Sequence, residues 1–208
     1  MDGAVKLLKE LLTIRSVNGR DDEGAVAEYL CKYFEQSGIS AHIQRIDATH
    51  ANVLAELEGE SDDAPIFWNG HLDTVPYGDT GEWKTDPAVP VERDGFLYGR
   101  GASDMKSGLA AMVYALCEYK KSGRPVPRTI HFLGTCDEEK GGIGAVKNAE
   151  TQTAAVRTAE EIANAEFVST MNADLAEAAF TSGCTATKHP ILLWQADAEH
   201  TFANTASD

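Results

Sequence analysis

PIFWNGHLD, residues 65–73, joins an apolar run to a polar turn. Residues 65–68 predict a short buried strand, and the turn at its end carries His71 and Asp73. Outward from this stretch, the hydrophobic periodicity predicts further helices and strands. Helices are predicted over 3–15, 22–37 and 105–119, and strands over 41–46, 52–57 and 128–133. This alternation indicates an α/β fold, with a mostly parallel sheet covered by helices on both faces.

Local signals refine these elements. Asp21 or Asp22 is the expected N-cap of the second helix, and Gly38 is expected to end it. An acidic loop is predicted near residues 60–63, and residues 75–101 are expected to be mostly loop, because they are rich in glycine, proline and aspartate. Ligands of such sheets bind at the carboxyl ends of the strands, which directs attention to the residues after 68 and after 133.

The charge balance excludes several classes of partner. The chain of 208 residues has 18 Lys+Arg against 33 Asp+Glu, a formal net charge of −15. A surface this acidic argues against sequence-independent binding of nucleic acid and against adhesion to anionic lipid. No apolar run approaches the roughly 20 residues of a membrane span, and the N-terminus lacks the pattern of a secretory signal. We therefore expect neither a nucleic-acid nor a membrane partner.

The cysteines are widely spaced and never form a CxxC pair. They are Cys31, Cys117, Cys136 and Cys184. This spacing indicates neither a disulfide framework nor a thiolate zinc site. A reducing, cytoplasmic setting is the prediction that follows.

His71 and Asp73 form the first candidate cluster. An imidazole can bind a metal through one nitrogen while a carboxylate takes the other N–H. Alternatively, His71 is a turn residue bonded to backbone. The second cluster, residues 99–106, delivers Asp104 to the start of a helix, where it is either a ligand or a helix cap. It does not match GxGxxG, which disfavours a dinucleotide-binding protein.

The third cluster is Asp137-Glu138-Glu139, directly after a predicted buried strand. Adjacent carboxylates repel, so the site favours a cation between them or a raised pKa on one of them. One acid can bind a metal while the other serves as general base toward water. With His71 and Asp104, these oxygen and nitrogen ligands suit zinc, cobalt or manganese at a hydrolytic site.

Three ordered motifs carry a resemblance to a known family. They are NGHLDTVP at 69–76, YGRGASDMKSG at 98–108 and GTCDEE at 134–139, followed by Gly142 and Gly144. From about residue 7 to residue 147, the chain resembles the M20 metallohydrolases. That family includes acetylornithine deacetylase, succinyl-diaminopimelate desuccinylase, aminoacylase, carboxypeptidase G and related dipeptidases. The resemblance implies a zinc-exopeptidase-like fold.

The resemblance also implies a site and a reaction. A pair of zinc ions, sometimes replaced by cobalt or manganese, would be held by His71, by Asp104 as the bridge and by Glu139. Glu138 would be the general base and Asp73 would orient His71. The reaction would be hydrolysis of an amide in a small N-acyl amino acid or peptide. Bacterial amino-acid biosynthesis is the common setting of such relatives, which favours a deacylase over a peptidase.

The resemblance further implies domains that the chain holds only in part. Residues 1–180 would be the N-terminal part of the catalytic domain, and residues 181–208 the beginning of a lid domain that makes the family homodimeric. The family's further acidic ligand has no match at 178–183, although Asp174 and Glu177 lie close by, and His200 is a candidate for the lid histidine. We therefore expect a truncated chain with an incomplete dimer surface. The alternative is a catalytically inactive fragment, or a metal-binding or interaction module that retains the motifs.

Overall fold

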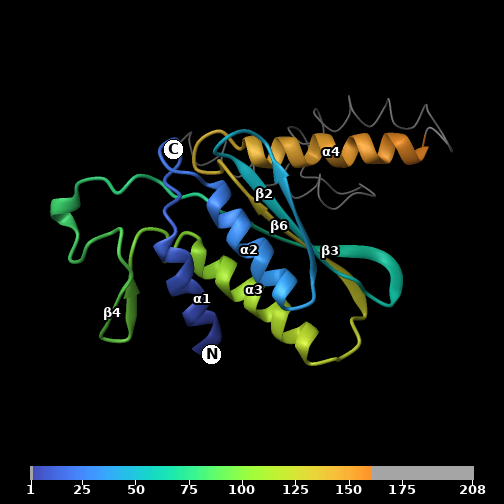
Figure 1. Ribbon diagram of the computed structural model, residues 1–208, viewed down its shortest axis with the longest axis horizontal. Helices are drawn as coiled ribbons and strands as arrows, with labels where there is room; N and C mark the ends of the chain where they lie inside the picture. Colours follow the sequence, from blue (N-terminus) through green and yellow to red (C-terminus); the bar gives the residue numbers. More distant parts are fainter. Residues whose placement is uncertain (1, 161–208) are drawn as a thin grey trace, which may run out of the picture. The chain divides into compact units, whose positions relative to one another are not determined.

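A computed structural model describes residues 2–160 of the chain (Figure 1). The chain divides into two compact units, Met1–Gly144 and Ala145–Asp208. The helices are α1 (Asp2–Thr13), α2 (Gly24–Gln36), α3 (Lys106–Lys121) and α4 (Ile143–Glu160), with a short 3₁₀ helix η1 (Thr80–Glu82). The strands are β1 (Ser40–Arg45), β2 (Ala51–Leu57), β3 (Ser61–His71), β4 (Val91–Arg93), β5 (Phe96–Tyr98) and β6 (Arg128–Thr135). The predicted domain boundary after residue 180 lies outside the described residues.

The main sheet of the first unit has the strand order β1-β2-β6-β3. The α/β class is confirmed, but over residues 2–160 the predicted mostly parallel sheet is corrected to a mixed one, in which only β3 and β6 run parallel. The connections give the reason. A tight turn at residues 46–50 joins β1 to β2 and permits only antiparallel pairing, whereas α3 provides the long crossover that parallel β3 and β6 require.

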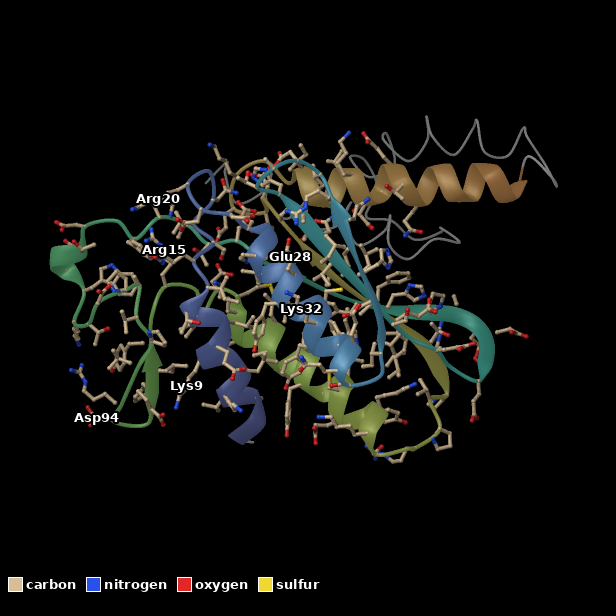
Figure 2. All side chains as sticks on the ribbon, in the orientation of Figure 1. Lys9, Arg15, Arg20, Glu28, Lys32 and Asp94 are labelled. Atoms are coloured by element: carbon tan, nitrogen blue, oxygen red, sulfur yellow. The ribbon has the colours of Figure 1, made fainter. Side chains whose placement is uncertain are left out.

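Helices α1, α2 and α3 lie on one face of this sheet (Figure 1). Phe34 of α2 and Phe132 of β6 meet at the centre of the core, with ring centroids 5.1 Å apart. The opposite side of α2 presents Glu28 and Lys32 to solvent (Figure 2). At Gly70, a Cβ atom would lie 2.9 Å from Leu109 Cδ2, so glycine permits α3 to pack closely on β3. The predicted helical cover of the other face stays a prediction.

Two predicted boundaries differ from the structure. Strand β3 begins at Ser61, so part of the predicted acidic loop belongs to an edge strand, where charged side chains face solvent. Within the predicted loop at 75–101, β4 and β5 form a hairpin. Its turn residues Asp94 and Gly95 both have positive φ angles, 54° and 78°, and Asp-Gly is a strong hairpin signal (Figure 2).

The start of α2 also differs from the prediction. Its N-cap is Glu23, rather than Asp21 or Asp22, and the Glu23 side chain makes no capping hydrogen bond. Gly38 does mark the end of the helix, with a φ of 74° that suits glycine. None of the helices within residues 2–160 has the length and apolarity that a membrane crossing requires.

Lys106 connects the start of α3 to the end of α1 from a fully buried position. Its Nζ donates to the carbonyl oxygens of Leu11, at 3.0 Å, and Ile14, at 2.6 Å. The last carbonyls of a helix have no partner within the helix, so a buried ammonium satisfies them and complements the helix dipole. Burial nevertheless lowers the pKa of Lys106 to about 8.

Replacing this lysine, as Lys106→Met, should change the pH dependence of stability. Because folding lowers the pKa from 10.5 to about 8, the unfolded chain binds more protons between these values. The wild-type free energy of unfolding should therefore gain about 2 kcal/mol, relative to the variant, between pH 7 and about 9.5. Urea unfolding of both proteins across this range measures the difference. If the free energies of unfolding of the two proteins changed in parallel with pH, the lowered pKa of Lys106 would be contradicted.

Candidate metal centre

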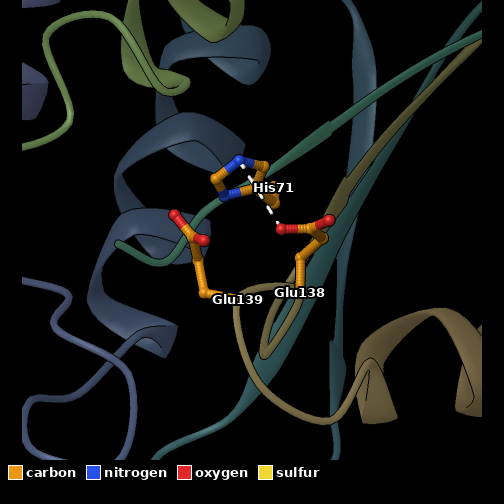
Figure 3. A group of neighbouring side chains, drawn as sticks. All are labelled: His71, Glu138 and Glu139. Atoms are coloured by element: carbon orange, nitrogen blue, oxygen red, sulfur yellow. Dashed lines mark ion pairs between the residues drawn. The ribbon is translucent and has the colours of Figure 1, made fainter. Parts of the chain in front are cut away.

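The neighbouring parallel strands β3 and β6 bring two of the predicted clusters together. His71 at the end of β3 lies opposite Thr135 at the end of β6. The turn after β6 therefore begins beside the imidazole. One ligand atom from each of His71, Glu138 and Glu139 can be chosen so that all lie within 4.8 Å of one another (Figure 3). The structure thus places these predicted site residues at one sheet edge.

His71 is buried, and its two ring nitrogens face different partners. Nδ1 lies 3.1 Å from the backbone oxygen of Asp73 and 3.6 Å from its Oδ1. Nε2 lies 2.9 Å from Oδ1 of Asp104 and 3.8 Å from Oε2 of Glu138. In the neutral ring, Nδ1–H donates to the Asp73 carbonyl, which leaves the Nε2 lone pair directed at the carboxylates. This is the orientation that a metal-binding histidine needs.

Electrostatics at this cluster favour a positive charge. Burial by itself would lower the pKa of His71, but hydrogen bonds with Asp73 and Asp104 and the charge of Glu138 raise it to about 9. Burial raises the pKa of Glu138 and of Glu139, and the neighbouring carboxylates add to the effect, although His71 opposes it. A bound cation would compensate the negative charge of the carboxylates, which bound protons otherwise reduce. The nitrogen and oxygen donors fit zinc and similar divalent ions.

Asp73 organises the turn that carries the two glutamates. Its side chain is fully buried, and Oδ1 accepts the backbone N–H of Glu138 at 3.1 Å. Oδ2 accepts the backbone N–H of Glu139 at 3.0 Å and Nδ2 of Asn18 at 3.0 Å. Burial would raise the pKa of Asp73, but the hydrogen bonds with His71, Glu139 and Glu138 lower it overall. Asp73 therefore remains ionised while it holds both His71 and the turn.

Asp104 reaches His71 from the loop before α3, and its side chain is 76% exposed. Met105, not Asp104, is the N-cap of α3, and α3 has no side-chain cap, so the alternative of a helix cap does not hold. Gly101 permits the loop to approach the turn after β3, because a Cβ there would lie 2.8 Å from Cγ2 of Thr74. The structure thus brings all five predicted site residues into one cluster.

Several polar residues that support this cluster escaped the sequence analysis. Asn52 is buried in β2, where its Oδ1 accepts the N–H of Cys136 and its Nδ2 donates to the carbonyl of Gly144. Asn18 and Glu23 also contact the turn after β6. An asparagine inside an apolar strand was the available signal for Asn52. Asp174, Glu177 and His200 lie outside the described residues.

The comparison with protein families decides the classification. Residues 67–184 match peptidase family M20/M25/M40, a match that includes all of the clustered residues. The chain belongs to this family.

Curated relatives share sequence with about two thirds of the chain. A probable succinyl-diaminopimelate desuccinylase of Staphylococcus epidermidis is 37% identical over 142 residues, which cover 68% of this chain and 34% of the relative. The succinyl-diaminopimelate desuccinylase of Leptothrix cholodnii is 40% identical over 151 residues, 70% of this chain and 39% of the relative. The matched part thus spans little more than a third of the length of these relatives.

Solved structures of M20 enzymes resemble the chain over a similar extent. Human carnosine dipeptidase 1 superimposes with a TM-score of 0.65 at 25% identity, covering 76% of this chain and 36% of the other. The M20 metallo-carboxypeptidase Sso-CP2 of Sulfolobus solfataricus gives a TM-score of 0.65 at 26% identity, covering 74% and 35%. The predicted zinc-exopeptidase-like fold is therefore confirmed.

Asp73→Asn tests the electrostatics of the metal-free site. Removing the charge should lower the pKa of His71 from its value of about 9 toward that of a free histidine, because the largest remaining influence, burial, acts in that direction. Titration of the imidazole resonances by NMR measures the change. His131, whose pKa burial lowers, is an internal control that should not move. An unchanged His71 pKa would show that Asp73 does not hold the imidazolium.

Proposed function

We propose that this chain carries the metal-binding part of a hydrolase that cleaves amide bonds in N-acyl amino acids or small peptides. The observation that carries the proposal is the convergence of His71, Glu138 and Glu139 within 4.8 Å, with Asp104 on the free nitrogen of the imidazole. Membership of the M20 family supports it. Its position at the carboxyl ends of the parallel strands β3 and β6 also supports the proposal, because α/β proteins bind their ligands there.

His71, Asp104 and Glu139 are the proposed metal ligands. A pair of zinc ions is the proposed content, with cobalt or manganese as substitutes, because the donors are imidazole and carboxylate. Bound metal at such a site lowers the pKa of water and polarises a carbonyl. Cys136 is not a proposed ligand, since burial raises the pKa of its thiol to about 12.

Glu138 is the proposed general base. Its carboxylate is partly buried and lies 3.8 Å from His71 Nε2, so it borders the same space as the ligands. Burial raises its pKa, which brings the carboxylate closer to the range in which it can take and return a proton. Glu138 would accept a proton from the attacking water and then donate it to the leaving amine. Asp73 would keep His71 and the turn in place throughout.

The names of the relatives support a proposal for the substrate class. The desuccinylase names among the curated relatives favour a deacylase of amino-acid biosynthesis, whereas the dipeptidase and carboxypeptidase titles among the solved structures favour a peptidase. We propose the deacylase first, because the desuccinylases share the higher identity. A homodimer and a cytoplasmic location complete the proposal.

A metal-binding module without activity is the second candidate function. Two observations favour it. The chain spans little more than a third of its curated relatives. Within residues 2–160, the candidate ligand cluster consists of His71, Glu138 and Glu139, with Asp104 beside them. An ion in a catalytic zinc site commonly takes three protein ligands, so these four side chains are too few to complete two such ions.

Zinc binding tests the ligand assignment. After equilibration with zinc and removal of free ion, the wild-type chain should retain zinc, and Glu139→Ala should weaken the affinity at least about tenfold, because a ligand is lost. Metal analysis and competition with a chromophoric chelator measure content and affinity. Glu118→Ala, an exposed acid on α3, is the matched control and should leave both unchanged. Equal zinc affinity in wild type and Glu139→Ala would contradict the assignment.

Hydrolysis separates the two candidate functions. The zinc-loaded chain is incubated with N-succinyl-diaminopimelate, N-acetylornithine and a dipeptide, and product amine is measured. An active hydrolase should lose at least about 100-fold in rate with Glu138→Gln while it retains zinc, since a general base contributes on that scale. Zinc binding without turnover in the wild-type chain would support the metal-binding module.

A further inference from the structure

The turn that presents Glu138 and Glu139 begins with an unfavourable backbone conformation. Asp137 has a φ of 61°, in the left-handed region that favours glycine. Surrounding contacts must hold such a residue in place. The contacts on its side chain are clear: Oδ1 accepts Nδ2 of Asn18 at 2.8 Å, and Oδ2 accepts the N–H of Ile143 at 3.2 Å.

The backbone N–H of Asp137 is held by a residue far away in sequence. Oε2 of Glu23 accepts it at 2.7 Å, and the Glu23 side chain is fully buried. Glu23 is the N-cap of α2, yet its carboxylate makes no bond to that helix. The side chain is thus directed at the turn after β6, at the expense of helix capping.

Stability alone does not explain an acid in this position. Burial, together with the charge of Asp73, raises the pKa of Glu23 to about 7. Burying a carboxylate is costly unless its hydrogen bonds compensate. Its second oxygen, Oε1, lies 3.5 Å from Nε2 of His50, and Nδ1 of His50 lies 2.8 Å from Oδ2 of Asp47. The carboxylate therefore joins the turn after β6 to the turn between β1 and β2.

We propose that Glu23 is a positioning residue of the metal centre, which fixes Asp137 and thereby the directions of Glu138 and Glu139. Glu23 holds the N–H of Asp137, Asn18 holds its carboxylate, and Asp73 holds the next two N–H groups. As far as zinc is concerned, this role rests on the proposed function. The ordering of the turn does not.

The variant Glu23→Asp separates positioning from structural stability. Aspartate keeps the charge and is a favoured N-cap, so it can stabilise α2. It is one methylene shorter and cannot keep the contact with the N–H of Asp137. We expect the backbone amides of Glu138 and Glu139 to exchange at least about tenfold faster, and zinc affinity to fall about tenfold, the scale known for partners that orient ligands.

Two further variants complete the test. Glu23→Gln retains an oxygen acceptor at the same reach and should restore amide protection and zinc affinity to within about threefold of wild type. Val26→Ala removes a buried side chain from the same helix and should lower the urea midpoint without changing either readout. Hydrogen exchange with mass spectrometry or NMR, chelator competition and urea unfolding are run on all four proteins.

The outcomes are distinct. The positioning role would be overturned if Glu23→Asp left both the amide exchange of Glu138 and Glu139 and the zinc affinity unchanged. It would also be overturned if Val26→Ala accelerated the exchange of these amides as much as Glu23→Asp does. Failure of Glu23→Gln to restore protection would overturn the hydrogen-bond basis for it. If wild type binds no zinc, the proposed function fails, and the exchange rates of Glu138 and Glu139 alone decide whether Glu23 positions the turn.

Discussion

The buried carboxylate of Asp73 is the interaction on which the candidate site depends. It accepts the N–H groups of Glu138 and Glu139 and lies beside Nδ1 of His71, so one side chain fixes the residues from two strand ends. This is possible because β3 and β6 are parallel neighbours and end at the same edge of the sheet. A charge buried this deeply requires several donors, and the site supplies them from backbone and from Asn18.

Several properties of the site follow from this arrangement. Fixing Nδ1 of His71 leaves Nε2 facing Asp104 and Glu138, so negative charge gathers on one side of the imidazole. Hydrogen bonds with Asp73 and Asp104 raise the pKa of His71 against the effect of burial, and burial together with the neighbouring carboxylates raises the pKa of Glu138. Both shifts express the preference of the cluster for a cation. The raised pKa of His71 and the placement of the candidate ligands therefore have the same cause, which is that Asp73 holds both His71 and the turn after β6.

The sequence predicted much of the fold and the location of the site. Helices α1, α2 and α3 follow from apolar periodicity, and the meeting of His71 with Glu138 and Glu139 follows from the rule that ligands bind at strand ends. The support of the turn could not be predicted, because Glu23 lies 114 positions from Asp137 and resembles an ordinary helix-start acid. In the mixed sheet, the antiparallel pairing of β1 with β2 follows from the short connection at residues 46–50, whereas β2 pairs with β6 across a long stretch of sequence, where tertiary contacts decide the partner.

X-ray absorption at the zinc K-edge of the zinc-loaded chain tests most directly whether the side chains at this sheet edge bind the metal. If His71, Asp104 and Glu139 bind the metal, the spectrum should show only nitrogen and oxygen ligands at about 2.0–2.2 Å. It should also contain outer-shell scattering from imidazole that disappears in His71→Ala. A sulfur ligand at about 2.3 Å, or imidazole scattering unchanged in His71→Ala, would contradict the assignment of the metal to this sheet edge.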